Sequence, residues 1–429
     1  MLGRIRDRNV WLVYATIFLL GAAYGSSLAV TPLRLAEIGF GKSEMGTLAS
    51  WFAGGIVAMS IPAGALIRRF SAKKTLIVSL LLYAVAVSLF GLQRTYLGAS
   101  AVRVLDGATS VGVWVGCETI LLARSDASNK AFVTSLYAMS IAVGYVVGAL
   151  AARVLTMFTG YQTVFFAAGG FALLALLVVA FGLDADKGGG AVVAASDEEA
   201  GPYRSPADQP ETAPLSSWAL LYRIKTSCFA TLAYGYFQAS VVLFLPIFLV
   251  HSKGVAEKDT ILMTAFFAAG MLLFSNVAGR LGDRHGHLRV MTVLATVGMF
   301  MTLGFVLLSS WTIMLGAIFV AGATLASISP VSLALSGLIS ERRDFARANG
   351  IYNACYAVGM LVGPPLSSVI FDRISGAAML LHLAAMWATF IAFCIFFRKD
   401  DPRARAVPSL RETAPAERRP LEPQRSAEE

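Results

Sequence analysis

The amino-acid sequence predicts an all-α membrane protein with twelve transmembrane helices in two pseudo-symmetric six-helix halves, and with both termini in the cytoplasm. Three observations lead to this prediction: an apolar composition, recurring apolar runs of spanning length, and a repeat at a fixed offset. Of the 429 residues, 57% are hydrophobic and 14% are charged, and the mean hydropathy is +0.68. Soluble domains have about 45–50% apolar and about 25% charged residues, so this chain has more apolar surface than a soluble core could bury.

Apolar runs of about twenty residues, the length that a helix needs to cross a bilayer, recur along the chain between short polar loops. Each run must be helical, because an open strand or a loop would leave backbone groups unpaired in lipid. The first run is too long for the core of a signal peptide, and no small-residue cleavage site follows it. The predicted spans are residues 10–31, 44–67, 75–93, 96–122, 131–155, 162–183, 226–250, 259–280, 288–309, 312–340, 349–371 and 377–397.

The basic residues predict the orientation. With both termini in the cytoplasm, only seven of the 35 Lys and Arg residues fall in loops or at the end of a span on the other side: Arg34, Lys42, Arg94, Arg153, Lys253, Lys258 and Arg373. An excess of Lys and Arg in the cytoplasmic loops is the positive-inside pattern. The net charge of +9 is therefore spread over short loops, and we expect no nucleic-acid partner.

Two polar segments divide the chain. Residues 184–216 collect Asp, Glu, Gly, Pro and Ser, and residues 398–429 are rich in Pro, Arg and Glu; both compositions are typical of disordered segments. The predicted organisation is an N-terminal half (1–183), a cytoplasmic linker (184–216), a C-terminal half (217–397) and a cytoplasmic tail (398–429).

The two halves repeat each other at an offset of 215 residues. The stretch from Gly64 to Arg69 aligns with the stretch from Gly279 to Arg284, and three further pairs follow: Tyr137 with Tyr352, Gly144 with Gly359, and Gly148 with Gly363. Two parallel halves related by an axis along the membrane normal form one of the known transporter plans.

Three motifs carry a resemblance to a known family. The loop after the eighth span, Gly279-Arg-Leu-Gly-Asp283-Arg284-His-Gly286-His-Leu-Arg289, resembles the signature loop Gly-x-x-x-Asp-Arg-x-Gly-Arg-x-Arg of the major facilitator superfamily. The copy between the second and third spans, residues 64–74, has Arg68 in place of the acid and Ser71 in place of the second glycine. Gly359-Met-Leu-Val-Gly363-Pro364 is similar to the motif of family antiporters in helix five, where this chain lacks the proline. Arg103-x-x-x-Gly107 is similar to the fourth-helix motif.

This resemblance covers all of the chain except the linker and the tail, and it implies the fold and the activity of that family. The expected protein is a multi-pass, monomeric transporter of a bacterial inner (plasma) membrane, which exports a drug-like or other small amphipathic solute in exchange for protons. The sequence has no Walker-type phosphate loop, so ATP is not the expected energy source. A uniporter or symporter of a small solute remains an alternative, as does a receptor or assembly factor that keeps the fold without transport.

The signature loop and the helix-eleven motif are the predicted gating elements. Asp283 could accept hydrogen bonds from the positive end of a neighbouring helix, and Arg284 could pair with a carboxylate of the other half. The alternative is a solvated turn whose charge sets topology. Gly359 and Gly363 permit close helix approach and Pro364 can bend the helix, unless these residues serve packing alone. The full predicted set is Gly64, Arg69, Gly279, Asp283, Arg284, Gly286, Gly359, Gly363 and Pro364.

The fourth span carries the predicted charge network. Arg103, Asp106 and Glu118 fall on one helical face, so they need not meet lipid. Charges inside a membrane are costly and usually face a cavity or a partner. Arg103 and Asp106 are three residues apart and can pair, whereas Glu118 lies about 18 Å along the helix from Asp106. A carboxylate in this setting could exchange a proton; the alternative is a static ion pair that fixes the helix.

The predicted substrate cavity is mostly apolar, with a few hydrogen-bonding groups. Its candidate residues are Tyr24, Trp114, Gln238, Ser329, Asn353 and Tyr356, each of which could instead bridge two helices. The four cysteines all lie in apolar runs without metal-ligand spacing. We therefore expect no metal site, no enzymatic activity and no cofactor other than protons as the coupling ion. The expected partners are a small-molecule substrate and the lipid bilayer.

Overall fold

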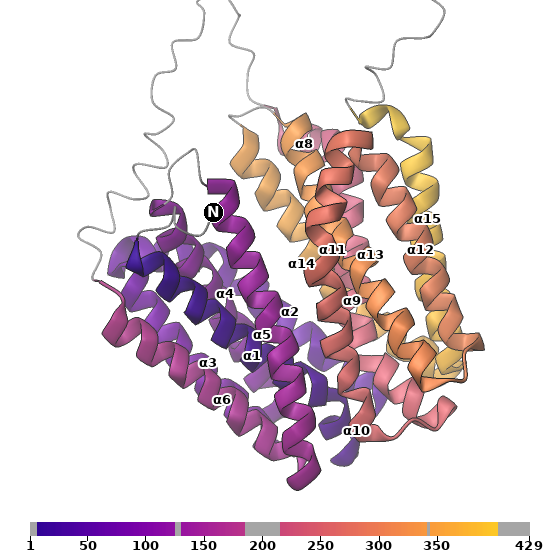
Figure 1. Ribbon diagram of the computed structural model, residues 1–429, viewed down its shortest axis with the longest axis horizontal. Coiled ribbons are helices and arrows are strands. Elements are labelled where there is room, and N and C mark those ends of the chain that lie inside the picture. The colour runs from indigo at the N-terminus through magenta and orange to yellow at the C-terminus, as the bar shows by residue number, and fades with distance from the viewer. Residues whose placement is uncertain (1–6, 125–129, 185–214, 341–343, 402–429) are drawn as a thin grey trace, which may run out of the picture.

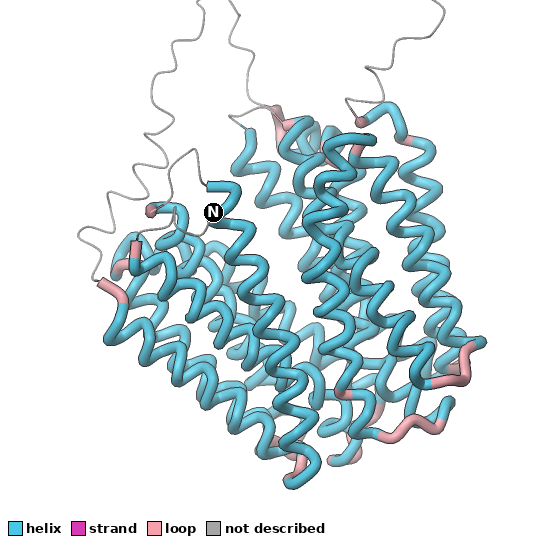
Figure 2. Tube along the Cα trace, in the orientation of Figure 1, coloured by secondary structure: helices cyan, strands magenta, loops and turns pink. Residues whose placement is uncertain are grey.

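The computed structural model describes residues 7–124, 130–184, 215–340 and 344–401, and these residues form helices joined by short connections (Figure 2). Most of the predicted linker and tail therefore lies outside the described residues. Within the described part, eleven helices are long and apolar enough to cross a membrane. A twelfth span is α2, which bends by 48° between Ser60 and Pro62. The predicted all-helical fold with this number of spans is confirmed.

The first bundle comprises α1 (Arg8–Glu37), α2 (Lys42–Phe70), α3 (Ala72–Leu92), α4 (Tyr96–Ala123), α5 (Lys130–Phe158) and α6 (Tyr161–Leu177), which continues as the π-helical turn η2 (Val178–Gly182). The second bundle comprises α9 (Lys225–Lys253), α11 (Leu262–His285), α12 (His287–Leu307), α13 (Trp311–Ile339), α14 (Phe345–Arg373) and α15 (Gly376–Phe396). Three short helices accompany it: α8 (Ser217–Arg223), α10 (Glu257–Thr260) and η4 (Arg398–Asp400).

Several helices extend beyond the predicted spans. Arg34, which follows the first predicted span, lies inside α1, and α5 continues past the predicted end of the fifth span to Phe158. The guanidinium of Arg34 is buried and donates to the Gly91 carbonyl at 3.0 Å and to Glu37 at 2.7 Å. Hydropathy shows only which part of a helix crosses the lipid. The backbone hydrogen bonds continue beyond this part until a capping residue ends the helix, which explains the helical turns outside the predicted spans.

Close contacts at glycines show the 215-residue repeat in three dimensions. A Cβ added at Gly107 of α4 would lie 2.0 Å from the Phe52 carbonyl oxygen of α2. Its counterpart Gly322 of α13 would lie 2.1 Å from the oxygen of Phe267 in α11. All four positions keep the same offset, so the α2–α4 and α11–α13 pairs are equivalent packing units of the two bundles.

The two bundles stand side by side and diverge toward the end that carries the described N-terminus and α8 (Figure 1). At the opposite end, near α10, they are joined by three polar links. Two are ion pairs, Lys42–Asp372 at 3.1 Å and Arg153–Asp259 at 2.7 Å. The third is a hydrogen bond of 2.8 Å from the Tyr161 hydroxyl to Glu257. The Ser50 hydroxyl of α2 also donates to the Leu361 carbonyl of α14 at 2.6 Å. Ser135 and Asn276, 3.4 Å apart, add a weaker link between α5 and α11, farther from α10.

Candidate functional site

A buried ion pair occupies the middle of α4. The guanidinium of Arg103 donates to the carboxylate of Asp106 at 2.9 Å, one helical turn away, and both residues are buried. Arg103 also donates to the Thr31 hydroxyl of α1 at 3.3 Å and lies over the ring of Phe90 at 4.1 Å. The predicted face of α4 therefore brings Arg103 and Asp106 together inside the first bundle.

The pair leaves one carboxylate oxygen without a partner. Asp106 Oδ1 is buried and accepts no hydrogen bond from the residues that the structure describes. Buried polar atoms are nearly always hydrogen-bonded, so an exception marks a functional position or a place for water. Glu118, by contrast, is exposed and makes no ion pair with another described residue. The third member of the predicted network is thus separate from the other two.

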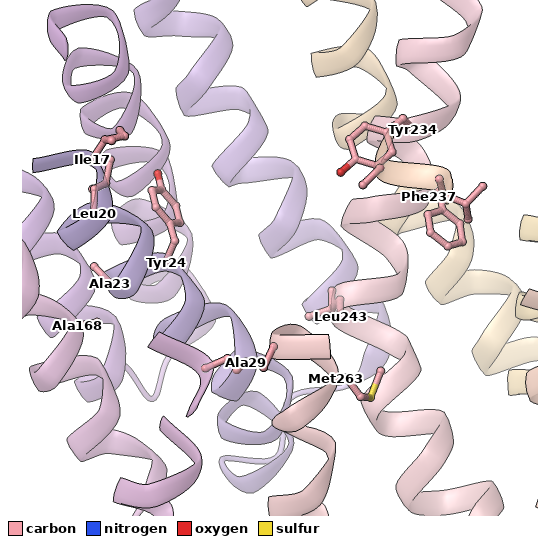
Figure 3. Close-up of a cluster of buried hydrophobic side chains, with 14 of the residues drawn as sticks. Ile17, Leu20, Ala23, Tyr24, Ala29, Ala168, Tyr234, Phe237, Leu243 and Met263 are labelled. Atoms are coloured by element: carbon pink, nitrogen blue, oxygen red, sulfur yellow. The ribbon is translucent and has the colours of Figure 1, made fainter. Parts of the chain in front are cut away.

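An aromatic cluster links this pair to the region between the bundles. The hydroxyl of Tyr24 donates to Ser110, whose own hydroxyl donates to the Asp106 backbone carbonyl at 2.6 Å. The Tyr24 ring is stacked on Trp114 at 5.8 Å and on Tyr145 of α5 at 6.0 Å. Figure 3 shows Tyr24 on α1 and Tyr234 on α9, which belong to opposite bundles.

A cavity of about 280 Å³ lies mainly in the second bundle. Of the predicted cavity residues, Gln238, Ser329, Asn353 and Tyr356 line it, whereas Tyr24 and Trp114 lie outside its lining. Its apolar walls include Phe237 and Met263, which Figure 3 also shows. The first bundle contributes two lining residues, Leu28 and Tyr145. None of the lining residues is Asp, Glu, Lys, Arg or His.

The polar groups of the cavity are partly paired with one another. The Tyr356 hydroxyl donates to Gln238 Oε1 at 2.8 Å, which holds the amide in place. The Tyr352 hydroxyl donates to the Ser329 carbonyl at 2.8 Å, and Asn353 donates to Asn349 at 3.3 Å. The Gln238 side-chain nitrogen has no acceptor among the described residues, so it can donate to a bound molecule.

Sequence reasoning missed Tyr145, Tyr234 and Phe237 as cavity residues. All three lie in uniformly apolar runs, where periodicity does not show which face meets the cavity. Tyr145 directly follows Gly144 of the repeat, and this position could have indicated that Tyr145 lies near the cavity.

The cavity and the ion pair occupy equivalent places in the two halves. Adding 215 to Arg103 and Asp106 gives Ile318 and Ala321, and both line the cavity. The equivalence rests on the matched glycine contacts of α4 and α13. In the first half this site contains an ion pair; in the second half it is apolar and hollow.

The predicted gating loop has no partner in the first bundle. Asp283 and Arg284 are exposed, and among the described residues neither forms an ion pair across the bundles. Asp283 lies 3.5 Å from His287 of the adjacent α12. The bundles diverge at this end (Figure 1), and the described carboxylates of the first bundle form no ion pair with this loop. Gly279, Gly64 and Arg69 border the two equivalent loops, and Arg69 lies over the ring of Phe70 at 5.3 Å.

The glycines of the helix-eleven motif do permit close approach. A Cβ at Gly359 would lie 2.2 Å from the Leu232 oxygen of α9, and one at Gly363 would lie 2.6 Å from the Tyr236 oxygen. Pro364 lies inside the continuous helix α14, and its carbonyl oxygen faces Gly46 of α2, where an added Cβ would lie 2.8 Å away. Gly286 has φ +94° and directly precedes α12 as its N-cap residue.

Comparisons with known proteins agree with this architecture. The family model of the Major Facilitator Superfamily matches residues 11–256 and 227–427. The uncharacterized MFS-type transporter YcaD of Shigella flexneri is 22% identical over 400 residues, which cover 93% of this chain and 98% of YcaD. YcaD of Escherichia coli O157:H7 is also 22% identical over the same shares of both chains.

Two solved structures share the fold. The nucleoside transporter NupG has a TM-score of 0.74 at 14% identity, covering 91% of this chain and 99% of its own. A bacterial homologue of the human lysosomal transporter Spinster, in an inward-facing and occupied conformation, has a TM-score of 0.65 at 14% identity, covering 91% and 94%. The chain is therefore a transporter and not an enzyme, and it belongs to the Major Facilitator Superfamily.

Proposed function

We propose that this protein exports a neutral, amphipathic organic solute across a bacterial inner membrane in exchange for protons. The observation that carries the proposal is the difference between the two equivalent sites: an uncharged cavity in the second half and a buried ion pair in the first. An apolar pocket with a few polar groups is typical of small-molecule sites. The lack of charge among the lining residues favours a neutral solute, because a charged one would be desolvated without a counter-charge.

Asp106 is the proposed proton carrier. Its Oδ1 has no hydrogen-bond partner among the described residues, so this oxygen can accept a proton while Oδ2 stays near Arg103. A bound proton would neutralise the carboxylate and weaken its attraction to the guanidinium. Arg103 would then be free to turn toward other acceptors, which changes the contacts between α4 and α1 at Thr31.

Tyr145 is the proposed link between solute and proton. It is the one aromatic residue of the first bundle in the cavity lining, and its ring stacks on Tyr24. Tyr24 is connected through the Ser110 hydroxyl to the backbone of Asp106. A solute that displaces the Tyr145 ring would therefore disturb the surroundings of the ion pair.

In this proposal the structure represents the state that is open to the cytoplasm. Both ion pairs and the Tyr161–Glu257 hydrogen bond between the bundles lie at the end opposite the termini, and the positive-inside pattern assigns that end to the outside. Export then requires these links to break while the loops at the other end close, and the two states must differ in their affinity for the solute or the proton.

Flux measurements in proteoliposomes test the proposal. Neutral, cationic and anionic fluorescent solutes of similar size would be compared with and without a pH gradient. The expected result is gradient-driven movement of the neutral amphipathic solute, reduced in Gln238→Ala and in Tyr145→Ala. Equal flux of all probes, or flux without dependence on pH, would instead indicate an uncoupled carrier with another specificity.

A further inference from the structure

The loop between α2 and α3 is the part of the signature motif that the transport proposal leaves unexplained. Arg68 stands where the motif has an acid, and Arg69, Lys73 and Lys74 complete a purely basic loop. No Asp or Glu occurs anywhere between Glu44 and Asp106. The second-half copy, in contrast, keeps Asp283, so the first-half loop has lost the residue that a gate would need.

An apolar groove of about 600 Å³ runs from this loop along α2, α3 and α4. Phe70 and Lys74 line its loop end, and Val78, Leu82 and Leu105 line its length. The hydroxyls of the lining residues Thr75 and Thr109 donate to carbonyl oxygens at helical spacing, Ser71 at 2.9 Å and Leu105 at 2.8 Å. The surface of the groove is therefore mainly apolar. Val78 and Phe70 are about half exposed, so a bound molecule can contact them.

The cations at the loop end are available for binding. Arg68 and Lys74 are exposed, and neither forms an ion pair or side-chain hydrogen bond with the residues that the structure describes. Lys73, in contrast, donates to the Leu183 carbonyl and is occupied. The groove thus has an uncompensated positive end and an apolar body, the two features that an anionic amphiphile requires.

We propose that this groove is a binding site for an anionic phospholipid of the leaflet at the loop end, with an acyl chain along α3 and the phosphate at Lys74, the cation among the residues that line the groove. Basic residues near a membrane attract anionic lipids, and the apolar groove supplies the second contribution. A zwitterionic lipid fits the groove but lacks the net negative charge. The acidic linker of this chain carries charge, but its apolar run is the five residues 191–195, all Ala or Val.

Lipid titration of the purified full-length protein tests this site. Native mass spectrometry in detergent would compare phosphatidylglycerol with phosphatidylethanolamine of identical acyl chains. The parent protein should prefer phosphatidylglycerol, and Lys74→Gln should reduce that preference about fivefold. The matched control is Arg289→Gln, which removes the exposed cation at the equivalent position of α12, 215 residues on, and should leave the preference unchanged.

A variant that fills the groove distinguishes lipid binding inside the groove from general attraction of lipids to surface charge. Val78→Trp places a large ring in the groove without changing any charge, and it should lower the affinity for long-chain phosphatidylglycerol. An unchanged affinity in this variant, or an equal loss in Arg289→Gln and Lys74→Gln, would overturn the proposal. Because the readout is lipid binding, these results are independent of whether Asp106 carries protons.

Discussion

Arg103 and Asp106 are buried charged residues, and each is stabilised by the opposite charge of the other. Taking charges out of water is costly, and their mutual attraction offsets that cost only while both are present. Arg103 has further contacts with Thr31 and Phe90, so it is anchored more firmly than Asp106. This difference leads to a prediction about stability.

Arg103→Ala should destabilise the protein more than Asp106→Asn. The alanine leaves the Asp106 carboxylate buried without its partner, at a cost of about 3–5 kcal/mol, whereas the asparagine removes one charge and still accepts a hydrogen bond from Arg103. Thermal unfolding in detergent, followed by intrinsic fluorescence, measures both variants against Glu118→Gln. Equal melting temperatures for Arg103→Ala and Asp106→Asn would contradict the assignment.

Ser71 adopts a backbone conformation that glycine would hold without strain. Its φ of +84° and ψ of +154° match the φ +94° and ψ +136° of its counterpart Gly286, so the loop keeps the shape of the motif after losing the glycine. Such a conformation costs a non-glycine residue about 1–3 kcal/mol. The side chain compensates in part, because it accepts a weak hydrogen bond from the Lys74 backbone at 3.4 Å.

Ser71→Gly should therefore stabilise the protein by about 1 kcal/mol, since relief of strain outweighs the loss of the cap. Ser375→Gly is the matched control: Ser375 caps α15 in the same way, by accepting from Ala378 at 3.0 Å, but its φ of −176° is unstrained extended backbone. The control should be neutral or slightly destabilising. A lower unfolding temperature for Ser71→Gly would show that the loop is not strained.

The charged residues of α4 could be predicted from the sequence, because charge inside an apolar run is rare and demands a partner. The exposure of Glu118 could not, since its position on the helical face does not show which neighbouring helices cover it. Four cavity residues were predicted from their polarity. Tyr145 was not, because an aromatic residue in an apolar run is equally compatible with packing against lipid.

At the scale of the helix, glycine decides how closely neighbours pack. Gly55 of α2 faces α4, where an added Cβ would lie 2.1 Å from the Val104 carbonyl oxygen, whereas an added Cβ at Gly54 would meet no atom within 4 Å. Gly55→Ala should cost about 1–3 kcal/mol or more, because the two backbones would have to move apart. Gly54→Ala should be neutral or gain about 0.5–1 kcal/mol, since alanine favours the helix. Similar unfolding temperatures for the two variants would contradict this α2–α4 contact.

The number and order of the helices followed from apolar run length, which lipid enforces strictly. The ends of the helices could not be predicted in this way, as the position of Arg34 inside α1 shows. The bend of α2 next to Pro62 and the π-helical turn after α6 also escaped prediction, because hydropathy does not depend on how the backbone pairs locally.

At the scale of the whole molecule, the positive-inside pattern predicts which end faces the cytoplasm. Ser217 and Lys258 are both exposed and lie at opposite ends of the second bundle (Figure 1). In a cysteine-free background, Lys258→Cys should react with a membrane-impermeant maleimide in intact cells, and Ser217→Cys should react only after permeabilisation. The reverse pattern would invert the proposed topology and the assignment of the open end.

We assign different roles to the two halves, because their equivalent sites hold an ion pair in the first bundle and a cavity in the second. The repeat was predicted from aligned glycines and loops. The difference between the two sites required the structure, since the positions of Ile318 and Ala321 on the cavity side of α13 are set by tertiary packing.

The most direct test of the account is paired flux in proteoliposomes containing the parent protein, Asp106→Asn or Glu118→Gln. For each protein, accumulation of a neutral solute against its gradient, driven by a pH difference, is measured beside exchange of the same solute at equal concentrations and equal pH. We expect that Asp106→Asn exchanges solute but does not accumulate it, while Glu118→Gln does both. Accumulation by Asp106→Asn at the parent rate would contradict the central claim that this carboxylate couples solute movement to protons.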